Sequence, residues 1–122
     1  MIPLALAVAA SFNLVCVGTQ DTIQFGKTVE TDKPVRSTFS IDLEAKRFCF
    51  EGCEQTLPIA SVSETEIVLQ RTTIPKDKAS FERTVNRESG EMYARIEIAG
   101  VALVTYSRCE AKPFTGFPVK KF

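Results

Sequence analysis

Four cysteines are the residues of this chain whose type and spacing most readily suggest chemistry: Cys16, Cys49, Cys53 and Cys109. Four thiolates could hold a zinc ion, but such sites usually combine two pairs of cysteines that are close in sequence. Only Cys49 and Cys53 are close in this chain. We therefore expect two disulfides and no metal site.

Four cysteines permit three disulfide pairings. Cys49 and Cys53 flank a short segment in which Gly52 allows a turn, so a local bridge is expected there. Cys16 lies in the first expected strand and Cys109 follows the last one. A bridge between these two would join the two ends of the domain.

Histidine is absent from all 122 residues. Catalytic sites that need an imidazole base, such as Ser-His-Asp and Cys-His sites, are therefore excluded within this chain. Carboxylates occur in near pairs, namely Glu51 with Glu54, Glu64 with Glu66 and Glu88 with Glu91. Proximity in sequence does not supply the fixed separation across a cleft that a glycosidase needs. With no phosphate-binding glycine loop and no nucleophile elbow, we expect neither an enzyme nor a cofactor.

Apolar and polar residues alternate along much of the chain, which is typical of antiparallel strands that have one face in a core and the other in water. The clearest alternating apolar residues are Val35, Phe39, Ile41 and Leu43 in one segment and Met92, Ala94, Ile96 and Ile98 in another. Turn residues separate such segments, and the Lys33-Pro34 dipeptide is expected to interrupt a strand.

Seven or eight short strands at this spacing predict an all-β antiparallel meander, either a small barrel or a sandwich. A bridge between Cys16 and Cys109 favours the barrel, because closure places the first and last strands side by side. Closure would also remove exposed sheet edges, which invite aggregation.

One cation stands out within this pattern. Arg83 shares a strand parity with Phe81 and Val85. If that face turns inward, Arg83 is a semi-buried cation that requires a carboxylate partner or an anionic ligand. The alternative is an arginine near the rim whose charged head stays in water.

The amino-terminal run is apolar and ends in small residues, Ala7-Val8-Ala9-Ala10. Such an ending suits a signal-peptidase site, so we interpret residues 1–10 as a signal-peptide remnant and residues 11–122 as a single domain. A first strand or a buried turn is the alternative. The run is too short for a transmembrane segment. We therefore expect a periplasmic or secreted protein.

Charge is balanced, with fifteen basic and fifteen acidic side chains. Nucleic-acid binders usually carry a basic excess that displaces counterions from phosphates. We expect no nucleic-acid partner.

The carboxyl-terminal segment is rich in phenylalanine and proline. Its two prolines preclude a central strand. Phe114, Phe117 and Phe122 are expected to plug one open end of a barrel. The alternative is an exposed aromatic patch for a partner.

Three segments resemble a group of small, uncharacterised exported proteins of sphingomonad-type alphaproteobacteria. They are Phe12-Asn13-Leu14-Val15-Cys16, Cys49-x-x-x-Cys53 and Phe114-x-Gly116-Phe117-Pro118. The resemblance implies export and a single domain, and it brings no function with it.

A second motif, Ser89-Gly90-Glu91-Met92-Tyr93, is similar to the Ser-Gly-x-x-Tyr motif of periplasmic c-type lysozyme inhibitors. This resemblance implies that Ser89 enters the lysozyme cleft and that Tyr93 braces the loop. The family also has a Lys-Gly pair on the following loop, where this chain has Ala99-Gly100.

These observations predict an exported binding or interaction module without catalysis. Its partner is an unidentified protein or small molecule, and its oligomeric state is not indicated. The candidate partner-binding residues are Ser89, Gly90, Tyr93, Phe114 and Phe117. A lysozyme inhibitor acting through the Ser89-Gly90 loop is the first alternative. A carrier of a small apolar ligand is the second, because small barrels can enclose one.

Overall fold

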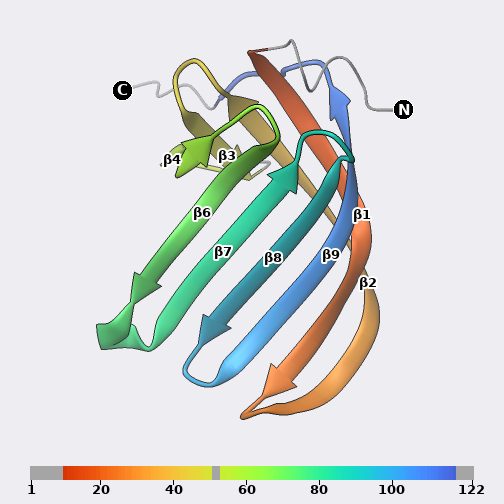
Figure 1. The fold of residues 1–122 in the computed structure, drawn as a ribbon, viewed down its shortest axis with the longest axis vertical. Coiled ribbons are helices and arrows are strands. Elements are labelled where there is room, and N and C mark those ends of the chain that lie inside the picture. The colour runs from red at the N-terminus through yellow and green to blue at the C-terminus, as the bar shows by residue number, and fades with distance from the viewer. Residues whose placement is uncertain (1–9, 51–52, 118–122) are drawn as a thin grey trace.

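The computed structural model describes residues 10–50 and 53–117. All of the predicted signal remnant except Ala10 lies outside the described residues, and so does Phe122. The described chain forms nine antiparallel strands and one short 3-10 turn (Figure 1). The all-β prediction is confirmed.

The strands are β1 (Ser11–Gln24), β2 (Lys27–Asp42), β3 (Arg47–Phe50), β4 (Leu57–Pro58), β5 (Ser61–Val62), β6 (Glu66–Ile74), β7 (Ala79–Asn86), β8 (Glu91–Ile98) and β9 (Val101–Lys112). The 3-10 turn η1 (Pro75–Asp77) joins β6 to β7. Three of these strands are longer than the short strands that we expected, because β1, β2 and β9 span 14, 16 and 12 residues.

The nine strands belong to one sheet in the order β4-β3-β2-β1-β9-β8-β7-β6-β5. This order consists of two meanders, β1 to β4 and β5 to β9, in which strands that follow each other in sequence also pair. The pairing of β1 with β9 joins the two meanders. The first and last long strands are therefore neighbours in the middle of the sheet, as the expected Cys16–Cys109 bridge required.

One expected strand break is wrong. Pro34 does not interrupt β2 and lies opposite Thr19 of β1. Strand β3 pairs only with the stretch of β2 from Phe39 onwards, so β2 is an edge strand at Pro34. A proline is tolerated at an edge because its missing N–H is not needed by a neighbouring strand.

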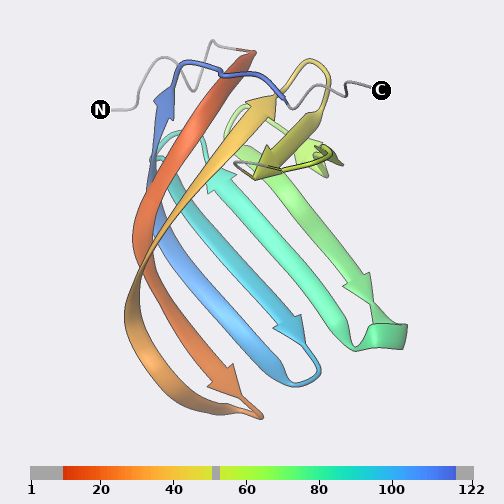
Figure 2. The same ribbon diagram turned by 180° about the vertical axis from the view of Figure 1, so that it is seen from behind.

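The sheet curls until its two edges meet at one end, which we call the upper end. Edge strands β4 and β5 are separated by only Ile59 and Ala60. The Ile59 N–H donates to Lys46 O, and the Ala60 N–H donates to Val68 O, at 2.9 Å each. The chain therefore passes directly from one edge of the sheet to the other. The result is a half-barrel, closed at the upper end and open at the lower end, in place of the closed barrel that we favoured (Figures 1 and 2).

The hydrophobic core fills the closed upper end. Its fully buried side chains come from both meanders and include Phe12, Leu14, Phe39, Ile41, Phe48, Ile67, Leu69 and Val85. We call the face of the sheet that carries them the inner face. These residues alternate with outward-facing ones along each strand, as the sequence pattern predicted.

The inner face is uncovered at the lower end. Residues 27–34 of β2 are all exposed, so this half of β2 covers nothing. Figure 2 shows the lower parts of β7, β8 and β9 with no further layer of the chain over them.

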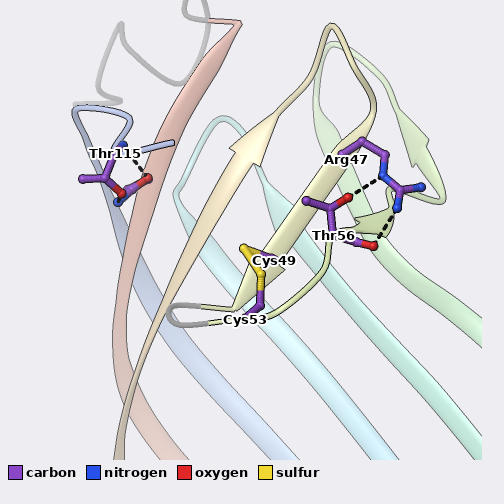
Figure 3. The surroundings of a disulfide bond; sticks show 6 residues. Arg47, Cys49, Cys53, Thr56 and Thr115 are labelled. Carbon is purple, nitrogen blue, oxygen red and sulfur yellow. Dashed lines mark hydrogen bonds between the residues drawn. A yellow bond between two sulfur atoms is a disulfide. The ribbon is translucent and has the colours of Figure 1, made fainter. Parts of the chain in front are cut away.

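Both expected disulfides are present. Cys16 and Cys109 lie directly opposite each other on β1 and β9, with their Cα atoms 4.0 Å apart. Cys49 and Cys53 form the local bridge beside β3 (Figure 3). In the same region the Arg47 guanidinium donates to the hydroxyl and the carbonyl oxygen of Thr56 at 2.9 and 2.6 Å.

The two bridges should differ in their contribution to stability. Replacing both Cys16 and Cys109 with alanine is expected to lower the free energy of unfolding by about 4 to 5 kcal/mol, because the bridge closes a long loop. Replacing both Cys49 and Cys53 with alanine should cost about 2 kcal/mol, since that loop is short. Urea titrations of the oxidised proteins followed by circular dichroism would measure both values, and equal losses would contradict this ranking.

Candidate functional site

Arg83 lies at the boundary between the closed and open parts of the inner face. It belongs to β7, two residues before the core residue Val85. Its guanidinium carbon lies 5.3 Å from the centre of the Phe39 ring and 4.8 Å from that of Phe50. The side chain therefore points inward and reaches across the curl to strands of the other meander, as one of the two sequence interpretations required.

No carboxylate neutralises Arg83 among the described residues. The ion pairs found there join Arg71 to Glu82, Arg95 to Glu97, Arg108 to Glu91 and Lys112 to Glu110. The Nε–H of Arg83 is buried and has no hydrogen-bond partner. Burial lowers the pKa of Arg83 to about 10, because desolvation penalises the charged form. Arg83 is still a cation at neutral pH.

Gln70 is the second buried polar group at this place, and the sequence pattern did not reveal it. Gln70 lies opposite Arg83 on β6, and its Oε1 is buried without a hydrogen-bond donor. Leu69 is the extra residue of a β-bulge, because Val68 pairs with Thr84 and Gln70 already pairs with Arg83. A bulge shifts the alternation by one residue, so Gln70 faces inward with Leu69 instead of outward.

Apolar side chains continue the inner face below Arg83. Phe81, Ile96 and Leu103 lie opposite one another on β7, β8 and β9, and all three are half-buried. The next positions on the same face are Ala79, Ile98 and Val101. From Arg83 to Ala79 the strand advances by roughly 13 Å. The open part of the inner face thus combines, at its upper limit, a cation without a carboxylate partner among the described residues with an apolar surface below it.

This arrangement suits an amphiphilic anion. A carboxylate or sulfate near Arg83 would supply the acceptor that the guanidinium lacks, and an attached apolar chain would cover Phe81, Ile96 and Leu103. Among the described residues, no cluster of carboxylate or cysteine side chains is arranged to hold a metal ion.

The Ser89-Gly90 motif forms the turn between β7 and β8. The Ser89 hydroxyl accepts a hydrogen bond from Glu91 N at 3.1 Å, and Asn86 Oδ1 accepts from the N–H groups of Glu88 and Ser89. Gly90 has φ +78°, and a Cβ there would meet Cys109 O at 2.9 Å. The hydrogen bonds of this turn and the limited space at Gly90 therefore account for Ser89 and Gly90 in structural terms. Insertion of Ser89 into a lysozyme cleft stays a prediction.

Tyr93 lies on the outer face, in a hollow that is also lined by Asn86 and Glu91 on either side of that turn. Its ring contacts the ring of Tyr106, with centroids 5.4 Å apart. Both tyrosines line a hollow on the outer face together with Arg108 and Glu91. In this hollow Arg108 Nη2 lies 3.5 Å from Glu91 Oε1, and Glu66 also lines it. The arginine of the outer hollow therefore has a carboxylate partner, whereas the described residues offer none to Arg83.

The aromatic residues of the tail contact each other. The rings of Phe114 and Phe117 meet edge to face, with centroids 5.3 Å apart, and both residues are half-buried. Thr115 ties the tail to β1, because Asn13 Nδ2 donates to its hydroxyl at 2.9 Å and its N–H donates to Asn13 Oδ1 (Figure 3). Leu43, Leu57 and Ala111 are the half-buried apolar residues that pack against the core. The tail phenylalanines are not among them, so the core does not enclose a plug made by these two rings.

Comparisons with protein-family models, curated proteins and solved structures find no match. The two resemblances described above therefore stay predictions. Within the described residues, there is no helix with the length and hydropathy needed to span a bilayer.

The pairing of Arg83 with Gln70 allows a direct test of the buried charge. Gln70→Glu places a carboxylate opposite the guanidinium at almost constant volume, so the free energy of unfolding should rise by about 1 to 3 kcal/mol at pH 7. Pairing with Arg83 lowers the pKa of the new carboxyl in the folded protein. The gain is therefore present above about pH 4.3 and is lost as pH falls through that lowered pKa.

Urea titrations at pH 7 and at pH 3 would measure this gain. Gln55→Glu makes the same charge change at an exposed position and should alter stability by less than about 0.5 kcal/mol. An equal change in the free energy of unfolding for the two substitutions would show that an anionic partner does not stabilise buried Arg83.

Proposed function

We propose that this protein is a non-catalytic binding module of an extracytoplasmic compartment, and that its open inner face binds an amphiphilic anion. The observation that carries this proposal is the guanidinium of Arg83, which is desolvated and has no carboxylate partner among the described residues. A buried charge without a partner is costly, so a chain that retains one is expected to use it.

The compartment is supported by the two disulfides. Such bridges persist in oxidising environments such as the periplasm or the exterior of the cell, and cytosolic thiols are kept reduced. The interpretation of residues 1–10 as a signal remnant agrees with this location. The balanced net charge argues against nucleic acid as the ligand.

The two parts of the inner face would contribute differently to binding. The apolar row of Phe81, Ile96 and Leu103 contributes binding free energy roughly in proportion to the apolar area that the ligand buries. This contribution does not discriminate among apolar chains. Arg83 supplies specificity, because a charge-assisted hydrogen bond to an anionic head is worth about 1.5 to 3 kcal/mol. The proposed ligand class is therefore a monoanionic lipid or a detergent-like molecule with a single chain.

Replacing Arg83 separates these two contributions. Arg83→Met keeps an unbranched side chain against Phe39 and Phe50 but removes the charge. Affinity for dodecanoate is expected to fall at least tenfold, while affinity for dodecanol should change less than twofold. Isothermal titration calorimetry below the critical micelle concentration would measure both affinities.

The matched control is Arg71→Met on the neighbouring strand β6, where the arginine is exposed and lies 3.6 Å from Glu82. This control should bind both probes as the unmodified protein does. Failure of the unmodified protein to bind dodecanoate at millimolar concentration would overturn the proposal. An equal loss of both probes in Arg83→Met would show that the arginine acts through the shape of the site.

A further inference from the structure

Three turns lie together at the lower end of the half-barrel, where the inner face is open (Figure 1). They are the Phe25-Gly26 turn between β1 and β2, the η1 turn between β6 and β7, and the Ala99-Gly100 turn between β8 and β9. Backbone hydrogen bonds connect them, because Phe25 N donates to Gly100 O at 2.8 Å and Ala99 N donates to Lys78 O at 3.1 Å. The three turns therefore form one continuous rim.

Phe25 occupies this rim at a conformational cost. Its φ of +49° lies in the left-handed region, which is unusual for a bulky residue. The two-residue turn that it forms with Gly26 normally favours Asn-Gly or Asp-Gly. Its ring is 80% exposed but is not loose, because it lies against Gly100, where a Cβ would come within 2.5 Å of Cε1. The fold therefore holds a large aromatic ring in water at a position where a small polar residue would be more stable.

Other apolar side chains accompany Phe25. Ile74 ends β6 and is 38% exposed, and Ile98 ends β8 and is 50% exposed. Exposed large apolar side chains that gather at one place on a protein usually mark an interaction surface.

Basic residues flank these apolar side chains. Lys27, Lys76 and Lys78 are all exposed, and Asp77 is the one acidic residue within positions 24–28, 74–78 and 98–101. This local excess contrasts with the balanced charge of the whole chain. We define the lower rim as Phe25, Lys27, Ile74, Lys76, Lys78 and Ile98.

We propose that the lower rim docks onto an anionic lipid surface. Aromatic and aliphatic side chains partition into the headgroup region, and each lysine close to an anionic surface adds electrostatic attraction to it. The positive charge of the rim favours an anionic lipid surface. A protein partner would need a larger apolar contact area than the three apolar side chains of the rim provide. The inference does not depend on the ligand proposed for Arg83, although it places the open inner face beside the membrane.

Vesicle sedimentation tests this docking directly. The full chain with its disulfides intact should bind vesicles of equal parts phosphatidylglycerol and phosphatidylcholine, and bind vesicles of phosphatidylcholine alone at least tenfold more weakly. Binding should weaken severalfold between 0.1 and 0.5 M salt, because salt screens the lysines.

Three substitutions locate the contact. Phe25→Asn should reduce vesicle affinity at least fivefold and leave the melting temperature equal or higher, because Asn-Gly suits the turn. Ile98→Thr should reduce affinity, whereas Val17→Thr, at a similarly exposed strand position on the outer face, should not. Lys76→Glu should reduce affinity, whereas Lys46→Glu, in the β2–β3 turn at the upper end, should not.

Two further readouts keep this inference separate from ligand binding. Arg83→Met should bind vesicles normally, and Phe25→Asn should bind dodecanoate normally. Absence of binding to anionic vesicles would overturn the inference. Equal binding by Phe25→Asn and the unmodified protein would also overturn it, and so would loss of vesicle binding in Arg83→Met, which would place the lipid contact on the inner face.

Discussion

The pairing of β1 with β9 is the constraint on which the rest of the structure depends. Each meander can form from contacts that are local in sequence, and this pairing joins them over twelve residue pairs, from Asn13 opposite Lys112 to Gln24 opposite Val101. Two features make it specific. The Cys16–Cys109 bridge fixes the register, and Gly18 allows a close approach, because a Cβ there would collide with Tyr106 O. The curl that follows brings Phe39 of β2 against Arg83 of β7.

The half-barrel divides its inner face between a packed core and the open surface for which we propose binding. At the upper end the edges are joined through Ile59, and large side chains fill the interior completely. At the lower end the same face continues, but the opposing strands have diverged and none of the described strands covers it. Arg83 lies where these two regions meet, so one side of its guanidinium rests on Phe39 and Phe50 while the site below stays open. Its guanidinium is therefore positioned by two rings and has no carboxylate partner within the described part of the chain, an arrangement that suits recognition of an anionic head.

The alternating pattern and the turn residues allowed most of the long strands to be predicted, because those features depend on neighbours in the chain, although Pro34 does not interrupt β2. The even cysteine count and the positions of Cys16 in the first expected strand and of Cys109 just after the last one allowed both disulfides to be predicted. Alternation placed Met92 and Ala94 on one face, and glycine marked the turn at Gly90. The inward direction of Arg83 was one of two open interpretations. Gln70 was missed because a bulge at Leu69 reverses the alternation, and bulges have no reliable local signature. The open lower end of the half-barrel was not predicted from the sequence. It depends on where the edge strands β4 and β5, which are joined by Ile59 and Ala60, meet in three dimensions.

Two places in this protein depart from what its fold alone would favour. Arg83 and Gln70 leave buried polar atoms unsatisfied where an apolar pair would be more stable, and Phe25 holds a left-handed conformation where asparagine would be better suited. At the same end Lys78 and Ala99 also have left-handed φ values of +48° and +51°, so Phe25 differs from them in carrying a large ring that is 80% exposed. Folded chains are otherwise consistent from local preference to global packing, so such departures are expected at functional positions. Both departures lie on or beside the open part of the inner face, at its upper and lower limits, and this coincidence supports our proposal that this surface binds a ligand.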